Sequence, residues 1–245
     1  MHTLSKMTFV ELKLKLREPI STFFTLVFPL LLLLLFGSIY GNEPTPFLGG
    51  RGNVDVTVPG YIAMIIGTLG IIGLPVALAE YRDQGILRRY RATPLSSSSI
   101  LSAQVVTNLA IALLGMALIV TAAYFVYDLE LPAAPLAVLV AIVFSGISFL
   151  AVGFLLAGLM PTASAAQAVG MAIYFPMLFL SGAGLPQAIL PDTLVKFSQV
   201  LPLTHVVNLL QDLWTGEGWN MTAVLVLGGM MIVATAVSTR TFRWE

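Results

Sequence analysis

Long apolar stretches alternate with short polar segments along the chain. A helix that crosses a membrane needs about 20 apolar residues, because each residue rises about 1.5 Å and the hydrocarbon layer is about 30 Å thick. Six stretches meet this requirement: 20–40, 60–79, 100–127, 136–159, 163–183 and 221–239. None of them contains Asp, Glu, Lys or Arg. The pattern predicts an all-α membrane protein with six transmembrane helices in a single domain, residues 1–245.

The first apolar stretch follows a basic N-terminal segment, so a cleaved signal peptide is an alternative to a spanning helix. Its apolar run is longer than the usual signal-peptide core of about 7–15 residues, and residues 37–40 offer no A-x-A-like cleavage site. We therefore expect a retained helix.

Two segments lie on the same side of the membrane as the N-terminus and differ from ordinary connecting loops. Residues 3–18 are basic, and we expect them to form a helix on the membrane surface that ends at Pro19, because a lone strand would leave its edges unpaired. Residues 80–95 form a long basic loop in which 86–91 could make a short surface helix. The third span then begins at Thr93–Pro94 or among the serines that follow.

The segment 184–219, on the opposite side, contains Pro191 and Pro202 but stays rich in apolar side chains. A solvated linker would be more polar. We expect short re-entrant helices here, because irregular backbone at membrane depth must be shielded by protein.

Composition and charge agree with a membrane location and give an orientation. Hydrophobic residues make up 58% of the 245 positions and charged residues 10%, against roughly a quarter charged in soluble domains. With the N-terminus inside, 10 of the 12 basic residues face the cytoplasm and only Arg51 and Lys196 face outside. The positive-inside bias therefore predicts that both termini are cytoplasmic.

The chain lacks the residues that usually form metal sites, nucleotide-binding sites and intramembrane sites for ion coupling. The chain has no cysteine and only two histidines, so we expect no metal site, and His205 is expected to be a structural residue. There is no phosphate-binding G-x-x-x-x-G-K-[ST] motif, so we expect no nucleotide to be bound by this chain. The spans lack the acids on which proton or sodium coupling usually depends, and the zero net charge gives no indication of nucleic-acid binding.

Three stretches carry a family likeness: residues 16–19 with 28–29 and 36–37, residues 80–95 with Gly85 and 92–95 at their core, and residues 201–205. Through them the whole chain resembles the ABC-2 type permeases, the membrane subunits of bacterial exporters, and is closest to the multidrug-type branch. The resemblance implies a location in the bacterial inner membrane. It implies a cargo that is an amphipathic drug, a lipid or a polysaccharide.

The resemblance also implies partners and site residues. Two copies of a separate ABC ATPase would bind ATP and magnesium, and a second permease copy, identical or different, would complete the pathway. The implied interface helix includes Lys13, Lys15, Arg17 and Glu18. The implied coupling helix and its surroundings include Glu80, Arg82, Gly85, Leu87, Arg88, Arg89, Tyr90, Arg91, Thr93 and Pro94. The implied outer re-entrant region includes Pro191, Pro202 and His205.

Alternatives to this hypothesis remain open at the level of sequence. The arginines of the 80–95 loop could be topology anchors that contact anionic lipid rather than a docking element. A secondary transporter would need no ATPase. An intramembrane hydrolase would need a nucleophile such as Ser145, Ser148 or Ser181 beside a base, although these serines also suit close helix packing.

Overall fold

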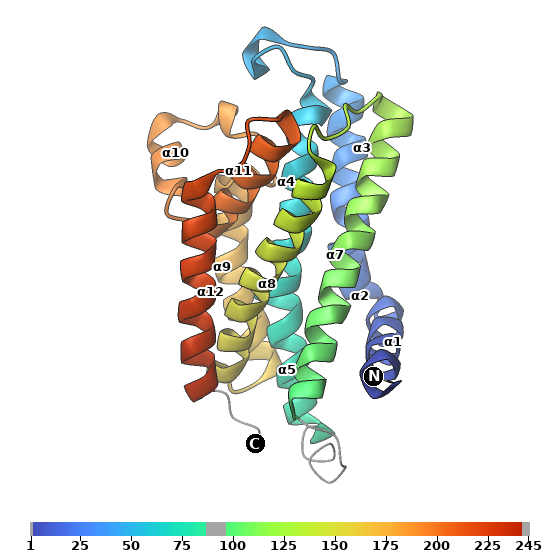
Figure 1. Ribbon diagram of the computed structural model, residues 1–245, viewed down its shortest axis with the longest axis vertical. Helices are drawn as coiled ribbons and strands as arrows, with labels where there is room; N and C mark the ends of the chain where they lie inside the picture. The colour runs from blue at the N-terminus through green and yellow to red at the C-terminus, as the bar shows by residue number, and fades with distance from the viewer. Residues whose placement is uncertain (1, 87–96, 242–245) are drawn as a thin grey trace.

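The computed structural model describes residues 2–86 and 97–241, and these residues contain helices but no extended β-strand. Six helical segments are long and apolar enough to cross a membrane: Pro19–Tyr40, Asn53–Asp83, Ser99–Tyr127, Pro135–Leu159, Ala163–Leu180 and Met221–Arg240. They confirm the predicted all-α fold with six spans. Figure 1 shows them as an upright bundle, with both ends of the chain at the same end of the bundle.

The second span is the centre of the bundle. In this span 78% of the most apolar window is buried, against 22–56% in the other five. It consists of α4 (Asn53–Gly67), η3 (Thr68–Gly73) and α5 (Leu74–Asp83). The spans around it are α2 (Pro19–Thr22) with η1 (Phe23–Val27) and α3 (Phe28–Tyr40), then α7 (Ser97–Tyr127), α8 (Pro135–Leu159), α9 (Ala163–Leu180) and α12 (Met221–Thr241).

The first two spans each contain a π-helical segment, η1 or η3, and the two segments contact each other. Each segment ends just before a proline, Pro29 or Pro75, in the first turn of the next α-helix. Proline lacks an N–H donor and its ring clashes with the carbonyl of the preceding turn, so a widened turn accommodates it. Such π segments often mark functional sites.

Glycines bring η3 into direct backbone contact with α8 and α9. A Cβ added to Gly153 would lie 2.4 Å from the carbonyl oxygen of Gly70, and one added to Gly170 would lie 2.8 Å from that of Ile71. Small residues allow the backbones to approach this closely. Close packing stabilises helix contacts in lipid, where the hydrophobic driving force between helices is weak.

The helix that contains the second span begins at Asn53, seven residues before the apolar stretch that the sequence predicts from Gly60. Pro59 lies inside this helix, whereas a proline normally marks a helix boundary. In the turn that Pro59 disrupts, Gln211 donates a hydrogen bond of 3.0 Å to the carbonyl of Val56. Neighbouring helices can supply such bonds, which is why membrane helices tolerate proline.

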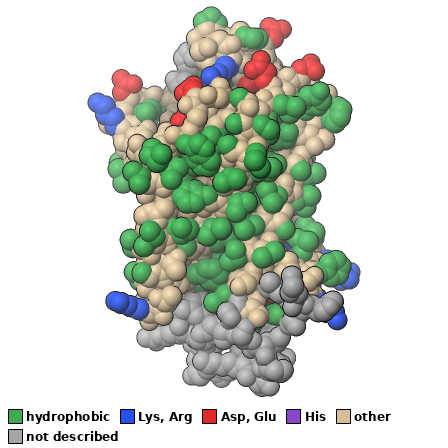
Figure 2. All heavy atoms as spheres, viewed as in Figure 1, with side chains coloured by type: hydrophobic (Ala, Val, Ile, Leu, Met, Phe, Trp, Pro, Cys, Tyr) green, Lys and Arg blue, Asp and Glu red, His purple; other side chains and the backbone are tan. Residues whose placement is uncertain are grey.

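The two ends of the bundle differ in their elements and charges. One end carries α1 (His2–Arg17), the end of α5 and the α8–α9 turn, and we call it the α1 end. The opposite end, the α11 end, carries η2 (Pro46–Leu48), η4 (Gln187–Ile189), α10 (Asp192–Ser198) and α11 (Pro202–Thr215). Figure 2 shows the visible Asp and Glu side chains gathered at the α11 end.

Helix α11 explains the apolar composition of the 184–219 segment. It buries a row of large side chains against α4, α8 and α12: Leu203, Val206, Val207, Leu209, Leu210, Leu213 and Trp214. Asn220 then caps α12, since its Oδ1 accepts the N–H of Ala223 at 3.0 Å, as expected for an N-cap. The α11 part of the segment therefore belongs to the packed core, whereas Ile189, Leu194, Phe197 and Val200 before it are exposed.

Candidate functional site

A buried carboxylate joins three elements at the α1 end. Glu11 of α1 is only 4% exposed. It accepts a hydrogen bond of 2.6 Å from the Tyr81 hydroxyl of α5 and one of 2.9 Å from the Gln104 amide of α7. Hydrogen bonds to a charged acceptor are roughly twice as strong as neutral ones. Helix α1 is therefore held directly to the second and third spans.

A second polar contact lies one helical turn further along α1. The Lys15 ammonium donates to Oδ1 of Asn108 at 2.6 Å, and the Asn108 amide donates to the Gln104 carbonyl at 2.7 Å. Burial lowers the pKa of Lys15 to about 8, although the nearby Glu11 carboxylate opposes this shift. We call Glu11, Lys15, Tyr81, Gln104 and Asn108 the α1 junction.

Arg82 and Asp83, next to Tyr81, fix the end of α5 to the α8–α9 turn. The Arg82 guanidinium donates to the carbonyl of Ala157 at 3.2 Å and to that of Met160, at the C-terminus of α8. The Asp83 carboxylate accepts the N–H of Ala163, the first residue of α9, at 3.2 Å. The cation thus lies at a helix C-terminus and the anion at a helix N-terminus, as the helix dipoles favour. We call this pair the Arg82–Asp83 clamp.

The chain leaves α5 through a turn that requires glycine. The N–H of Gln84 bonds to the Glu80 carbonyl, and that of Gly85 bonds to the Arg82 carbonyl. Gly85 has a φ of +67°, a left-handed conformation in which a side chain is strained. Glycine is therefore the residue that fits the end of α5.

The structure separates the site residues implied by the resemblance into groups. Lys13, Arg17 and Glu18 are exposed, whereas Lys15 is directed into the junction. Glu80 is half-buried, and Arg82 bonds within its own chain. Leu87, Arg88, Arg89, Tyr90, Arg91, Thr93 and Pro94 lie outside the described residues.

Comparison with known proteins decides the family. The family model described as ABC-2 type transporter matches residues 4–213, which is most of the chain. The chain belongs to the ABC-2 type transporter family. Family membership makes it the membrane subunit of an ABC transporter, a kind of subunit that normally works with an ABC ATPase.

This ABC-2 chain is similar along nearly its whole length to the Bacillus subtilis (strain 168) protein named "Putative transport permease YvfS". The two are 25% identical over 243 residues, which is 97% of this chain and 96% of the relative. ABC transporter G family member 20 of Dictyostelium discoideum is 25% identical over 72% of this chain, which spans only 23% of that protein. "Putative transport permease ycf38" of Pyropia yezoensis is 24% identical over 86% of this chain and 73% of its own length.

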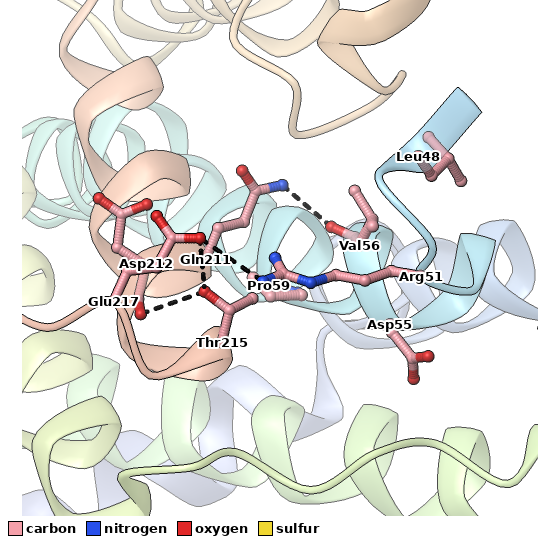
Figure 3. A pocket seen from close by; sticks show the side chains of 9 residues that line it. All are labelled: Leu48, Arg51, Asp55, Val56, Pro59, Gln211, Asp212, Thr215 and Glu217. Carbon is pink, nitrogen blue, oxygen red and sulfur yellow. Dashed lines mark hydrogen bonds and ion pairs between the residues drawn. The ribbon is translucent and has the colours of Figure 1, made fainter. Parts of the chain in front are cut away.

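The α11 end of the ABC-2 chain contains a polar pocket of about 350 Å³ between the start of α4 and the end of α11. In Figure 3, Gln211 reaches towards Val56, while Arg51 extends towards Glu217, with which it forms an exposed ion pair of 3.5 Å. Exposed pairs of this kind contribute at most about 1 kcal/mol. The lining of the pocket therefore carries charges of both signs.

Pro191, Pro202 and His205, which the resemblance assigns to an outer region, lie at the α11 end of the ABC-2 fold. Pro191 precedes α10, and Pro202 is the first residue of α11, where its missing N–H costs nothing. His205 is 6% exposed, and its Nε2 lies 2.9 Å from the Gln199 carbonyl. All three therefore define how the chain turns between α9 and α11.

Sequence reasoning missed four members of the α1 junction of this ABC-2 chain: Glu11, Tyr81, Gln104 and Asn108. A signal was present, because Gln104 and Asn108 are two carboxamides four residues apart on one face of a predicted span. Polar groups at such positions are expensive in hydrocarbon and need a partner. The partner comes from α1, which is nearly a hundred positions away in the chain, and no local pattern announces it.

Proposed function

We propose that this chain is the permease subunit of an ATP-driven exporter in a bacterial plasma membrane, with its α1 end in the cytoplasm. The charge distribution supports this orientation, because the basic residues concentrate at the α1 end and the acidic residues at the α11 end. The likeness to YvfS along the whole chain supports a bacterial permease. Amphipathic drugs, lipids and polysaccharides are the cargo classes that we propose.

The observation that carries the proposal is the α1 junction. An ATPase that docks on the exposed Lys13, Arg17 and Glu18 and on the 87–94 loop would move α1 and the end of α5 together, because Glu11 and Tyr81 join them. The Arg82–Asp83 clamp would carry that movement to α8 and α9. ATP and magnesium would be bound by the ATPase alone.

The energy required argues for such rigid connections. To shift a two-state equilibrium from 1:99 to 99:1, nucleotide binding must favour one state by about 5.5 kcal/mol. If α1 were loosely attached, it would move without the spans, and the free energy of nucleotide binding would not change their packing. The hydrogen bond of Tyr81 to the Glu11 carboxylate and that of the Arg82 guanidinium to Ala157 both involve a charged group, so they are strong connections of this kind. The π segments of the first two spans supply places where those helices could bend.

Charge reversal in the 87–94 loop tests the docking surface. We expect Arg88→Glu/Arg89→Glu to reduce the ABC ATPase that co-purifies with the chain at least tenfold, because the basic surface that contacts the partner is inverted. The measurement is ATP hydrolysis by the affinity-purified complex from native membranes, at equal amounts of permease. Arg51→Glu/Lys196→Glu, an equal charge change at the α11 end, should have no effect. Unchanged recovery of the ATPase with the first variant would contradict the docking surface.

A second permease copy is part of the proposal, and α9 is the surface that supports it. Gln167 is exposed on this span, and Ala168, Met171 and Phe175 continue its exposed face. A carboxamide facing lipid lacks a partner. In a symmetric dimer the same residue of the second copy can provide one.

Cysteine cross-linking tests this contact, because the natural sequence has no cysteine to interfere. We expect Ala168→Cys to give a disulfide-linked dimer as the main product in oxidised native membranes, since equivalent residues approach each other across a two-fold axis. Val233→Cys, on a 62% exposed position of α12, is the matched lipid-facing control and should remain monomeric. A dimer formed equally well by the α12 variant would contradict an α9 interface.

The hydrolase alternative gains no support from the described residues. The Ser148 hydroxyl donates to the Phe144 carbonyl at 2.9 Å, and the Ser181 hydroxyl accepts the N–H of Ala183 at 3.2 Å. The His205 ring is bonded to a main-chain carbonyl. The Ser145 hydroxyl is buried and has no hydrogen-bond partner among the described residues. None of the three serines is therefore bonded to a base, as a nucleophile would be.

A further inference from the structure

Helix α9 contacts the second span at the point where α4 is followed by η3. Tyr174 of α9 is only 4% exposed, and its hydroxyl donates a hydrogen bond of 3.0 Å to the carbonyl of Met64. The Thr68 hydroxyl lies 2.8 Å from the Tyr174 hydroxyl and 2.9 Å from the same carbonyl. The Tyr174 ring lies beside Gly67, where an added Cβ would be 2.8 Å from Cε2. Tyr174 is therefore joined to the last turn of α4 by both its hydroxyl and its ring.

The second span contains one residue more than a continuous α-helix between the same two ends. The N–H of Thr68 bonds to the carbonyl of Met64, four residues earlier, as in an α-helix. The N–H of Leu74 bonds to the carbonyl of Leu69, five residues earlier, and α5 then returns to the α-helical pattern. The widened turn of η3 thus takes up the extra residue. An α-helix rises 1.5 Å and turns about 100° per residue, so without this turn each residue of α5 would move to the place that its successor now holds.

The rotation of α5 decides which of its side chains faces the α1 junction. Tyr81 donates to the Glu11 carboxylate, and Arg82 donates to a carbonyl at the end of α8. After a shift by one residue Glu80 would take the place of Tyr81, and two carboxylates would meet where a donor and an acceptor meet now. Like charges at such short distance repel each other. The α1 junction and the Arg82–Asp83 clamp therefore both require the extra residue in η3.

A second contact from α9 lies one helical turn before Tyr174. A Cβ added to Gly170 would lie 2.8 Å from the carbonyl oxygen of Ile71. In a continuous α-helix this carbonyl would accept the N–H of residue 75, but Pro75 has none. Gly170 and Tyr174 are four residues apart, so one face of α9 meets the span at the start of η3 and again near its end.

The two hydroxyls explain why the helical pattern changes at this point. Side-chain donors that share a main-chain carbonyl compete with the helical N–H for it and bend the helix. Tyr174 and Thr68 do this at Met64, immediately before the bonding distance changes from four residues to five. Helix α4 is fixed independently, because Gln211 bonds to its Val56 carbonyl. A change at η3 is therefore passed on to α5.

We propose that Tyr174 is a positioning residue of the second span, which keeps the extra residue in η3 and so directs Tyr81 and Arg82 to their partners. It acts at a distance, because it lies about 16 Å along α9 from Ala163, where the Arg82–Asp83 clamp ends. That this orientation of α5 serves coupling to an ATPase rests on the proposed function. The register of the span does not depend on it.

Disulfide trapping tests the register, because the natural chain has no cysteine. The Asp83 carboxylate bonds to the main-chain N–H of Ala163, so Asp83→Cys/Ala163→Cys should form an intrachain disulfide in oxidised native membranes. After a shift by one residue, the cysteine of Arg82→Cys takes the place of Asp83. We expect Tyr174→Phe to speed disulfide formation in Arg82→Cys/Ala163→Cys at least fivefold and to slow it in the first pair. Thr68→Val, which removes the other hydroxyl, should act in the same direction. The measurement is the loss of thiols that react with a polyethylene glycol maleimide, followed as a gel shift.

Two controls separate a change of register from a general loosening of the bundle. Gln84→Cys/Ala163→Cys moves apart in the shifted register, so Tyr174→Phe should not speed its disulfide formation. Tyr127→Phe removes a bond of 2.8 Å to the Leu34 carbonyl of the first span and should leave all pairs unchanged. Unchanged rates in Tyr174→Phe, or an equal increase for the pairs at 82 and 84, would overturn the proposal. The assay needs neither ATPase nor cargo, so its outcome is independent of the transport function.

Discussion

Glu11→Leu is expected to lower ATP-driven transport about a hundredfold while the chain still inserts into the membrane. The substitution removes the acceptor shared by Tyr81 and Gln104, so α1 loses its charged connection to α5 and α7. The Gln104 side chain is completely buried, and its amide would then lack its acceptor, at a cost of about 1–3 kcal/mol. A hundredfold effect corresponds to about 2.7 kcal/mol, which lies within this range. The measurement is transport into inverted vesicles that contain the permease and its ATPase.

Graded variants distinguish loss of coupling from loss of folding. Glu11→Gln retains one acceptor oxygen and should keep about a tenth of the activity, whereas Tyr81→Phe removes only one of the two bonds to the carboxylate. If both residues act through one contact, the double variant Glu11→Gln/Tyr81→Phe will be little worse than the more damaging single variant. Lys6→Leu, on an exposed position of the same helix outside the proposed docking residues, is the control for changes to α1. Normal transport by Glu11→Leu would exclude the junction from coupling.

The spans could be predicted from sequence because the membrane imposes a simple rule. Every backbone polar group in hydrocarbon must be satisfied within the segment, so a long uncharged apolar run has to be a helix. The rule does not say where a helix begins, and at Pro59 the structure continues the helix for six residues towards the N-terminus. The bond from Gln211 to the Val56 carbonyl comes from α11, more than 150 residues later. A local pattern contains no information about such a partner.

The candidate site was less predictable for the same reason. The resemblance indicated that α1 and the 80–95 loop act together, but it did not say which side chains join them. The resemblance places Lys15 together with Lys13 and Arg17 in one interface helix. Helical geometry separates them, since Lys15 lies on the same face as Glu11, four residues earlier, and this face packs on α7. Charge identified the segment, whereas tertiary packing decided the role of each residue.

The Tyr81-Arg82-Asp83 sequence illustrates how an apparent surface cluster becomes an internal connection. Arg82 belongs to a run of arginines whose charge suggested contact with lipid or with a partner. In the structure its guanidinium satisfies carbonyls at the end of α8, which have no partner within that helix. Asp83 does the same for an N–H at the start of α9. Two neighbouring residues of opposite charge thus bond to the two helix ends at the α8–α9 turn, Arg82 to the end of α8 and Asp83 to the start of α9.

Arg82→Met is therefore expected to lower the free energy of unfolding by about 3 kcal/mol without reducing the amount of ATPase that co-purifies with the chain. A hydrogen bond to a charged group contributes about 1.5–3 kcal/mol, and the methionine side chain fills similar space but donates nothing. The measurement is denaturant unfolding in detergent, together with recovery of the ATPase from native membranes. Arg17→Met, on the exposed end of α1, is the matched control and should leave the stability unchanged.

The two readouts of this experiment separate the two roles that an arginine can have at this position. A structural role at the α8–α9 turn predicts lost stability, partial rescue by Arg82→Lys, and little further loss when Asp83→Asn is added, because both residues hold one turn. A docking role predicts normal stability with lost ATPase. Normal stability together with loss of the ATPase would mean that the Arg82 guanidinium leaves the Ala157 carbonyl when the partner binds. The clamp would then be a feature of the isolated permease, broken in the complex.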